Sequence, residues 1–302
     1  MCGILGVSKQ AYYKHHNVAS SRLAKRAFVV EFIKSVRQKD PKIGGNKLWM
    51  MYKQTFGKQL RVGYNQFYDI IDEFRLKVRR IRHRVKTTDS NHDFPLYPNL
   101  TKDLIPDRPG QLVVSDITYI PMSGSNPKGR KDFCYLSLIT DYYTKEIVGY
   151  SVAPTLETVH SMMALKMMLK RYRGMDLTQL IHHSDRGCQY ASYAYTRLLK
   201  QHGIAISMTE NGNPKDNAVA ERINNTIKNE LLCGIEMADI KAVRLAVRQA
   251  VEFYNTERPH LSLDGLTPRE AADRTGPLRK RWKSYREQAI KAKEEENKLT
   301  KQ

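Results

Sequence analysis

The sequence predicts an α/β protein: a mixed five-stranded sheet flanked by helices, preceded by a small all-α region of helix-turn-helix type. Three observations lead to this prediction. Apolar residues recur at helical spacing in the first quarter of the chain. After residue 110, three closely spaced strand-like runs are followed by segments that alternate between helix and strand. With 302 residues, the chain is long enough for one large core and a smaller domain.

The first 42 residues are predicted to form a basic helical segment. In the opening run LGVSKQAYYKHH, Gly6 suits a turn and Ser8 suits the cap of the helix that follows. Residues 22–38 continue with apolar residues at near-helical spacing among basic ones.

Residues 43–88 are predicted to be a helix-turn-helix-like DNA-binding region with a basic arm. A turn is expected at 56–63, between two short helices. The residues expected to face each other across this pair are Leu48, Met51, Tyr52, Phe67, Ile70, Ile71 and Phe74. Because helix pairs are common in proteins, their spacing alone is modest support for DNA binding.

The arm is the run RLKVRRIRHRVK at 75–86, which contains no acidic residue. A solvated charge run is one interpretation, and an arm that lies along a DNA backbone or in a groove is the other. The overall charge favours the arm. The basic residues expected to contact DNA there are Arg75, Lys77, Arg79, Arg80, Arg82, Arg84 and Lys86.

The charge of the whole chain points to a phosphate polymer as its partner. The net charge is +20, and residues 1–109 carry 22 Lys and Arg against 9 Asp and Glu. Residues 110–232 carry only 14 against 11. Such an excess of basic residues is typical of proteins that bind nucleic acid. The first third of the chain is therefore predicted to bind double-stranded DNA, and the middle to have another task.

The composition favours a cytoplasmic protein. No apolar run approaches the roughly 18 to 20 residues of a membrane span, and the N-terminus lacks the pattern of a secretion signal. The four cysteines are scattered and form no CxxC pair, so neither a disulfide framework nor a zinc ribbon is indicated. We expect no membrane partner.

Residues 89–109 are rich in proline and are predicted to be a linker, with a catalytic core at 110–276 and a charged tail at 277–302. The core is expected to begin with a three-stranded meander. Its predicted strands are 111–120, 132–144, 146–152, 177–183 and 204–208. Its predicted helices are 157–172, 190–203, one that is capped by Asp216 or Asn217 and includes Leu231, and 241–254.

Three acidic residues stand where chemistry is expected. Asp116 interrupts an apolar strand, where a carboxylate is costly unless it is paired or binds a metal. Asp185 follows the strand at 177–183, and ligand sites of α/β folds often lie at such strand ends. Glu221 lies in the first turns of a helix capped by Asp216 or Asn217. Each acid taken alone also has a purely structural interpretation: Asp116 on the exposed face of a strand, Asp185 in a turn, and Glu221 on the exposed face of a helix.

Together, the three acids can hold two divalent cations roughly 3.5 to 4 Å apart, the arrangement used for in-line displacement at phosphate. Their oxygen ligands suit Mg²⁺ or Mn²⁺ rather than zinc. Asn224, Asn225 and Lys228 share a polar helix face with Glu221. Lys228 is placed to contact the DNA backbone near the scissile bond, and Asn225 is a second candidate.

The run IHHSDRGCQY also invites other interpretations. A zinc site of His182, His183 and Cys188 lacks a second ligand pair at suitable spacing, and neighbouring strand histidines point to opposite faces. One of the two histidines is expected in the core. Ser184 lacks a recognisable base for nucleophilic catalysis. His183 and Gln189 remain candidates for supporting the site or contacting DNA.

The motifs SDITYI at Asp116, HSDRGCQY at Asp185 and DNAVAERINNTIK at Glu221 resemble the Asp-Asp-Glu core of insertion-sequence transposases related to retroviral integrases. The 35 residues between the second and third acids match this group, and YNTERPHLSLDGLTPREAA resembles its closing motif. The resemblance implies a ribonuclease H-like core, metal-dependent cleavage at element ends, and strand transfer by a 3′-OH without a covalent protein intermediate. It also implies a circular intermediate, a multimer on DNA, and a partner or fusion encoded by an upstream reading frame.

Three rival functions remain at the level of sequence. A non-catalytic or regulatory DNA-binding relative shares the basic N-terminal third, but leaves the three acids unexplained. A recombinase with a covalent tyrosine or serine nucleophile has no supporting Arg-His-Arg-Tyr pattern. A nuclease on the same fold would differ only in lacking strand transfer. For the transposase, we expect a location on the bacterial nucleoid.

Overall fold

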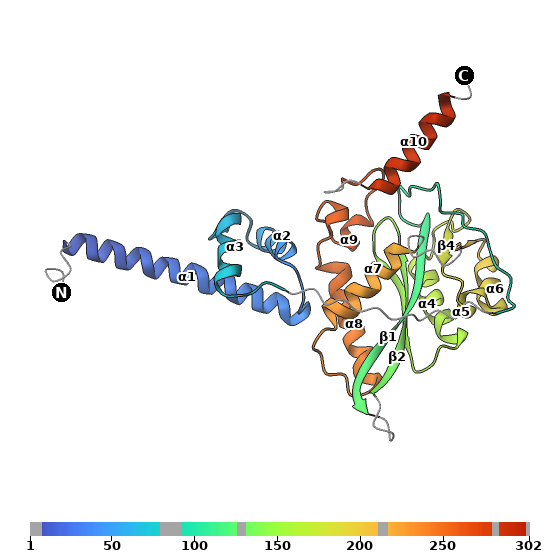
Figure 1. The fold of residues 1–302 in the computed structure, drawn as a ribbon, viewed down its shortest axis with the longest axis horizontal. Coiled ribbons are helices and arrows are strands. Elements are labelled where there is room, and N and C mark those ends of the chain that lie inside the picture. The colour runs from blue at the N-terminus through green and yellow to red at the C-terminus, as the bar shows by residue number, and fades with distance from the viewer. Residues whose placement is uncertain (1–7, 79–91, 126–130, 211–216, 280–283, 300–302) are drawn as a thin grey trace. The chain divides into compact units, whose positions relative to one another are not determined.

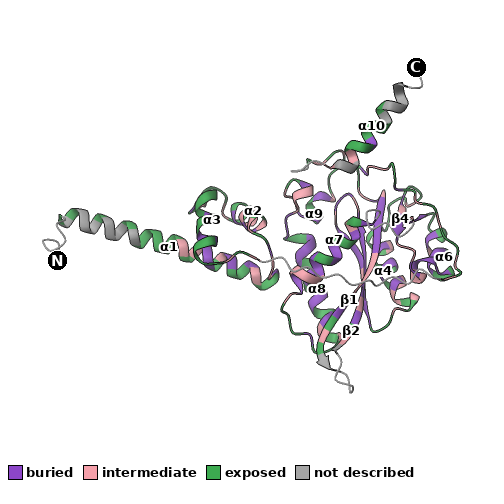
Figure 2. Cartoon of the chain, in the orientation of Figure 1, coloured by how far each residue is buried: buried purple, intermediate pink, exposed green. Residues whose placement is uncertain are grey.

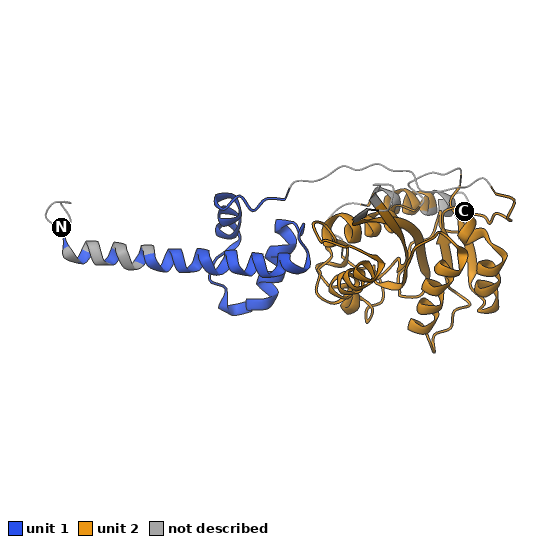
Figure 3. Ribbon diagram, turned by 90° about the horizontal axis from the view of Figure 1, so that it is seen from below, with its two compact units in different colours: residues 1–81 blue, residues 82–302 orange. Residues whose placement is uncertain are grey.

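The computed structural model describes residues 8–78, 92–125, 131–210, 217–279 and 284–299. The chain divides into two compact units, Met1–Ile81 and Arg82–Gln302 (Figure 3). The two units are taken separately below. Within the described ranges, no helix is both long enough and apolar enough to cross a membrane.

The first unit is all-helical, as predicted. It contains α1 (Lys9–Lys39), α2 (Gly45–Phe56), η1 (Gly57–Gln59) and α3 (Tyr64–Glu73). The helix α1 begins directly after Ser8 and runs without a break through the predicted segment 22–38, since neither glycine nor proline interrupts it. The predicted turn at Gly6 and the arm residues Arg79, Arg80, Arg82, Arg84 and Lys86 lie outside the described residues.

An aromatic cluster forms the core of the first unit. Tyr52 of α2 is buried against Phe67 of α3, with ring centroids 5.2 Å apart, and Phe32 of α1 approaches Tyr52 at the same distance. Leu48, Ile70 and Ile71 are buried, as predicted. Phe74 was predicted to be buried with them, and this was wrong, since it is 45% exposed. The helix α3 ends at Glu73, so Phe74 no longer continues its apolar face.

A mixed sheet forms the centre of the second unit. Its strands are β1 (Leu112–Ser125), β2 (Lys131–Asp141), β3 (Ile147–Ala153), β4 (Ile181–Ser184) and β5 (Ala205–Met208). Their spatial order is β3-β2-β1-β4-β5, with the first three antiparallel and β4 and β5 parallel to β1. This is the ribonuclease H-like arrangement, and it confirms the predicted fold class.

Helices cover both faces of this sheet (Figure 1). The helices of this unit are α4 (Thr158–Arg171), α5 (Cys188–Ala191), α6 (Tyr193–Gln201), α7 (Ala218–Thr226), the π-helical turn η2 (Ile227–Leu231), α8 (Ile240–Thr256), η3 (Leu261–Leu263), α9 (Pro268–Ala271) and α10 (Tyr285–Leu299), of which α10 projects away from the sheet. Alternate residues of β1 serve the two faces: Val113 packs in the cluster with α4 and α6, whereas Leu112 and Val114 pack with Ala220 of α7. Buried residues accordingly follow the strands and the inner sides of these helices (Figure 2).

Two predicted helices are interrupted. The segment 190–203 was expected to be one helix, but Ser192 adopts extended backbone angles, and its side chain accepts a hydrogen bond from the Tyr195 backbone to cap α6. The helix expected after a cap at Asp216 or Asn217 changes from α-helical to π-helical hydrogen bonding at Ile227. Such π-helical turns are rare and are often found at functional sites.

The described part of the predicted linker, 92–109, belongs to the second unit. It contains no helix or strand, yet it follows the edge strand β5. The Leu100 amide donates to Ser207 Oγ at 2.9 Å, and the Met208 amide donates to the Pro98 carbonyl at 3.4 Å. Phe94 and Tyr97 pack against the core cluster. The segment therefore covers the sheet edge instead of spacing two domains, because its prolines stand between apolar side chains that the core can bury.

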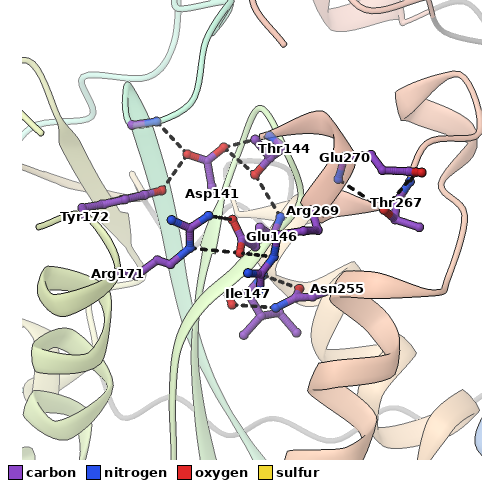
Figure 4. A network of polar contacts seen from close by, with 11 residues as sticks. Asp141, Thr144, Glu146, Ile147, Arg171, Tyr172, Asn255, Thr267, Arg269 and Glu270 are labelled. Atoms are coloured by element: carbon purple, nitrogen blue, oxygen red, sulfur yellow. Dashed lines mark hydrogen bonds and ion pairs between the residues drawn. The ribbon is translucent and has the colours of Figure 1, made fainter. Parts of the chain in front are cut away.

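A buried polar network joins the turn after β2 to α4 and to the C-terminal part of the unit (Figure 4). The buried Glu146 accepts bonds from Arg171 of α4 at 3.0 and 3.1 Å and pairs with Arg269 at 3.3 Å. Asn255 of α8 exchanges two 3.0 Å hydrogen bonds with the backbone of Ile147. Thr267 and Glu270 form a capping box at α9. The segment that resembles the closing motif of the family thus binds the turn between β2 and β3 through hydrogen bonds and an ion pair.

Candidate active site

Asp116 and Asp185 lie side by side at the same level of the sheet, the first within β1 and the second just after β4. Ser115 of β1 and Ser184 of β4 are partners in the parallel ladder, so Asp116 and Asp185 are the next residues on each strand. Burial and then the charge of Asp185 raise the pKa of Asp116 to about 7. The larger cause is the poorly solvated position of the carboxylate, and the neighbouring negative charge adds to it.

Glu221 approaches the same place from α7. Glu221 as a whole is exposed, but the partial burial of its carboxylate, followed by the charge of Asp185, raises its pKa. The charge of Glu221 in turn contributes to the raised pKa of Asp116. The structure therefore brings the three predicted acids into one electrostatic group, although they are separated by more than a hundred positions in the chain.

Both oxygens of the Asp116 carboxylate accept hydrogen bonds from the protein. The Ile117 amide donates to Oδ1 at 2.9 Å, and Asn224 Nδ2 donates to Oδ2 at 2.8 Å. Asn224 was predicted to share a polar helix face with Glu221, and the alternative was a solvent-exposed face. Asn224 is buried, since α7 turns it toward β1. Only its position three residues after Glu221 could have marked it from the sequence.

The start of α7 is held to β1 by a side chain that we expected to cap the helix. Asn217 is at the N-cap position, yet its amide donates to the Ser115 carbonyl at 2.9 Å, and it makes no capping hydrogen bond. The bond ties the helix that carries Glu221 to the residue that precedes Asp116. Asp216, the other cap candidate, lies outside the described residues.

The loop after Asp185 is tightly built. The Gly187 amide donates to Asp185 Oδ1 at 3.0 Å, and a Cβ on Gly187 would lie 3.1 Å from both Asp185 Oδ1 and Gln189 Oε1. The Arg186 side chain donates from Nε to the Thr209 carbonyl at 2.7 Å, and the Gln189 side chain donates from Nε2 to the Leu156 carbonyl at 3.0 Å. Gln189 thus anchors the loop toward α4.

One of the two histidines of the run IHHSDRGCQY was expected in the core, and both are buried there. The Nε2 atom of His182 is 2.8 Å from Ser115 Oγ and 2.9 Å from the Tyr195 hydroxyl, whereas Nδ1 of His183 is 2.8 Å from Ser207 Oγ. Burial, followed by the neighbouring His183, lowers the pKa of His182 to about 3. With Cys188 at the start of α5, these side chains form no metal cluster among the residues that the structure describes.

The predicted DNA-contacting residues fall in different places. Lys228 lies in η2, where its ammonium is 3.3 Å from the centroid of the Tyr119 ring and burial lowers its pKa. Asn225 is exposed and accepts a 3.1 Å hydrogen bond from Asn229. In the first unit, Arg75 and Lys77 follow α3 and are exposed, and Lys77 pairs with Asp72 at 2.6 Å.

The donor set of the site fits a hard divalent cation. Three carboxylates offer oxygen ligands, and a cation would relieve the mutual repulsion that the raised pKa of Asp116 reports. No three His, Cys, Asp or Glu side chains in the described ranges already surround a common point for one ion. The carboxylates therefore form an open group rather than a closed cage.

Comparison with known proteins identifies the family. The sequence matches the integrase core domain family over residues 106–214 and again over 202–268. It is 31% identical to the uncharacterized 31 kDa protein of insertion element IS600 from Shigella sonnei, over 89% of this chain and 96% of that protein. The chain belongs to the insertion-sequence transposases with an integrase core.

Two further insertion-sequence relatives agree with this assignment. The transposase is 29% identical to that of insertion sequence IS629 from Shigella sonnei, over 90% of each chain. It is 36% identical to the putative transposase InsK of IS150 from Escherichia coli, over 59% of this chain and 60% of that one. The catalytic core of HTLV-2 integrase, in complex with magnesium, is 16% identical with a TM-score of 0.41, over 55% of this chain and 97% of that one.

Family membership makes this transposase a polynucleotidyl transferase that acts on DNA. The integrase core is the family predicted from the three acid motifs, and it is not that of recombinases with a covalent tyrosine or serine nucleophile.

Proposed function

We propose that Asp116, Asp185 and Glu221 hold two divalent cations, Mg²⁺ or Mn²⁺, and that this site cleaves DNA at the ends of an insertion sequence and then joins the freed 3′-OH to another DNA. The observation that supports this most directly is the convergence of the three acids from within β1, from the residue after β4 and from α7, where the charge of Asp185 raises the pKa of both Asp116 and Glu221. When bound, the cations would polarise the phosphodiester and activate the attacking oxygen.

The residues around the acids have a positioning role in this proposal. Asn224 and the Ile117 amide fix the Asp116 carboxylate, and the Gly187 amide fixes that of Asp185. These bonds leave the remaining lone pairs of both carboxylates for metal. Because the attacking groups are water and a DNA hydroxyl, no protein side chain needs to become covalently bound to DNA.

We further propose that DNA contacts are divided between the units. Lys228 and Asn225, on the helix that carries Glu221, would contact the strand near the scissile phosphate. The basic arm at 75–86 would bind backbone phosphates elsewhere on the DNA and contribute affinity without sequence preference.

The partners of the reaction follow from its geometry. Two element ends must be brought together, so we propose a homomultimer assembled on double-stranded DNA at the nucleoid. The resemblance to two-frame elements supports a further protein segment, encoded upstream, that recognises the terminal repeats. An end-joining assay that compares this chain with one extended by its upstream frame tests that part.

The metal site is tested by a matched pair of variants. Glu221→Gln should lower Mg²⁺-dependent cleavage of element-end DNA by a factor of about 10³ or more, because a metal ligand is lost. Glu252→Gln, an exposed glutamate of α8, should leave cleavage unchanged. DNA binding should be nearly the same in both. Unchanged cleavage by Glu221→Gln would contradict the assignment.

The remaining rivals are separated by supplying pre-cut ends together with target DNA. A transposase joins the two, and a nuclease on the same fold leaves the ends unjoined. A regulatory relative would bind the ends and neither cut nor join them in Mg²⁺ or Mn²⁺.

A further inference from the structure

An aromatic group lies on the hairpin of β1 and β2, beyond the acids. Tyr119 of β1 pairs with Tyr135 of β2, and Phe133 is two residues from Tyr135 and therefore on the same face. The Phe133 ring is 6.0 Å from that of Tyr119 and 5.5 Å from that of Tyr135, edge-on in both cases. We call these three residues the hairpin aromatics.

The hairpin aromatics are not fully buried in the hydrophobic core. Phe133 is 50% exposed, and Tyr119 and Tyr135 are partly exposed. A singly exposed hydrophobic residue would need no explanation. Here, however, three rings are adjacent, and the Lys228 ammonium lies 3.3 Å from the Tyr119 centroid. Rings beside a lysine combine surfaces for bases with a charge for phosphate.

The group is also near the catalytic acids. Tyr119 is three residues after Asp116, or about 10 Å along an extended strand, so its ring is on the opposite face of β1 from the Asp116 carboxylate. Lys228 connects the two at the edge of β1 that β4 leaves unpaired after Ser115. Lys228 is on the same helical segment as Glu221, in the π-helical turn η2 that continues α7. β1 pairs with β4 only over Leu112–Ser115, so the hairpin extends past that strand (Figure 1). A strand held at the acids has neighbouring nucleotides within reach of these rings.

We propose that the hairpin aromatics, with Lys228, stack the unpaired bases of a frayed DNA end next to the scissile phosphate. This inference rests on the proposed function of the acids. A paired duplex keeps its base faces inside the helix, so only unpaired nucleotides offer faces to the rings. Stacking tolerates any base, since each has a π-face, whereas Lys228 supplies the charge for the adjoining phosphate.

The chemistry favours DNA over a protein as the occupant. The sequence that connects the two strands, SNPKGR followed by Lys131, is basic, and an apolar protein surface gains nothing from a lysine at its centre. A nucleic-acid strand is attracted by both features.

The test compares forked and blunt DNA, bound to the full chain in Ca²⁺ to prevent cleavage. The probe is a duplex whose last three nucleotides on each strand are unpaired, with 2-aminopurine among them. Phe133→Ala should weaken forked DNA about 5- to 100-fold, as expected for the loss of one stacked base, and blunt DNA less than about twofold. The quenching of 2-aminopurine by wild type should decrease in parallel.

Two further variants keep the test decisive. Phe133→Trp should retain tight binding of forked DNA, and Phe133→Leu, which keeps apolar bulk without a π-face, should behave as Phe133→Ala does. Tyr193→Ala removes an aromatic that is 63% exposed on α6 and should change neither DNA. Equal losses on both DNAs, tight forked-DNA binding by Phe133→Leu, or no loss would overturn the proposal.

Light scattering distinguishes a protein interface. If Phe133→Ala lowers the mass of the particle and binds both DNAs equally, Phe133 is a contact between copies and the proposal is wrong. Because no cleavage is needed, the result is independent of the metal-site test. A failed Glu221→Gln experiment with an intact forked-DNA difference would remove the proposed function alone.

Discussion

Three separate parts of the chain meet at the Asp116 carboxylate. Its own strand contributes the Ile117 amide, the third motif contributes Asn224, and Asp185 contributes its charge. The acids were recognisable from the sequence because Asp116 interrupts an apolar strand, Asp185 follows a strand and Glu221 lies in the first turns of a helix. Their supporting residue Asn224 was not, since an asparagine on a helix has no preferred partner until the helix is packed.

Asn224 provides the first prediction at this scale. Asn224→Ala removes the donor to Asp116 Oδ2 and should weaken Mn²⁺ binding by about 10- to 100-fold, the usual effect of losing a partner of a metal ligand. Calorimetric titration of Mn²⁺ into the chain without DNA measures this. Asn229→Ala, in the next turn, is the control and should bind Mn²⁺ as wild type does. Equal affinity of all three would show that Asn224 does not position the ligand.

His182 provides a prediction for pH. Its folded pKa of about 3 lies below the usual value near 6.5, so between these values the unfolded chain binds a proton that the folded chain does not. Stability should therefore decrease as the pH falls below about 6.5. From pH 7 to pH 5, urea unfolding should show wild type losing up to about 2 kcal/mol more than His182→Gln. Parallel losses in both proteins would argue against a neutral buried imidazole.

At the scale of elements, β3 and α4 are in unusually close contact. A Cβ on Gly149 would lie 2.2 Å from the Ala164 carbonyl oxygen, so only glycine permits this approach. The strand pattern located β3 correctly, but the pattern holds no information on which helix crosses it. The closeness is a property of the packed pair.

Gly149→Ala should therefore push α4 away from the sheet and destabilise the second unit by about 1 to 3 kcal/mol or more. Tyr150→Phe is the control, because it changes the same strand without adding an atom against α4. Thermal unfolding compares the two variants with wild type. An unchanged midpoint for Gly149→Ala would mean that the contact between β3 and α4 is looser than described.

The contacts made by the segment that resembles the closing motif are a second feature at the scale of elements. Arg258 is buried and pairs with Glu230 of η2, while Asn255 and Arg269 reach the turn after β2. The sequence motif was recognisable only by resemblance, because its charged residues read locally as a solvated loop. The burial of Arg258 and its ion pair with Glu230 show that this residue ties η2, the continuation of α7, to the segment after α8.

At the scale of the molecule, charge is divided unevenly along the chain. The net charge of +20 lies mostly in residues 1–109, and the catalytic part is nearly balanced. Binding of duplex DNA should accordingly weaken steeply with salt.

The double variant Arg79→Gln with Arg80→Gln should lower the slope of log affinity against log salt concentration by roughly 2, about one for each lost phosphate contact. Lys241→Gln with Arg248→Gln, two exposed basic residues of α8, is the charge-matched control and should leave the slope unchanged. Fluorescence anisotropy with a generic duplex at several salt concentrations gives the slopes. Equal slopes in both double variants would show that the arm does not contact phosphate.

The sequence by itself determined the elements and the chemistry. Strand and helix periods, the excess of basic residues and the three acids are local or additive properties, so they could be read without coordinates. The tertiary structure decided what depends on distant neighbours: the burial of Asn224, the docking of 92–109 on β5, and Lys228 on the Tyr119 ring. Those contacts join residues far apart in the chain. Their energies come from burial and from paired polar groups, which exist only after the sheet has assembled.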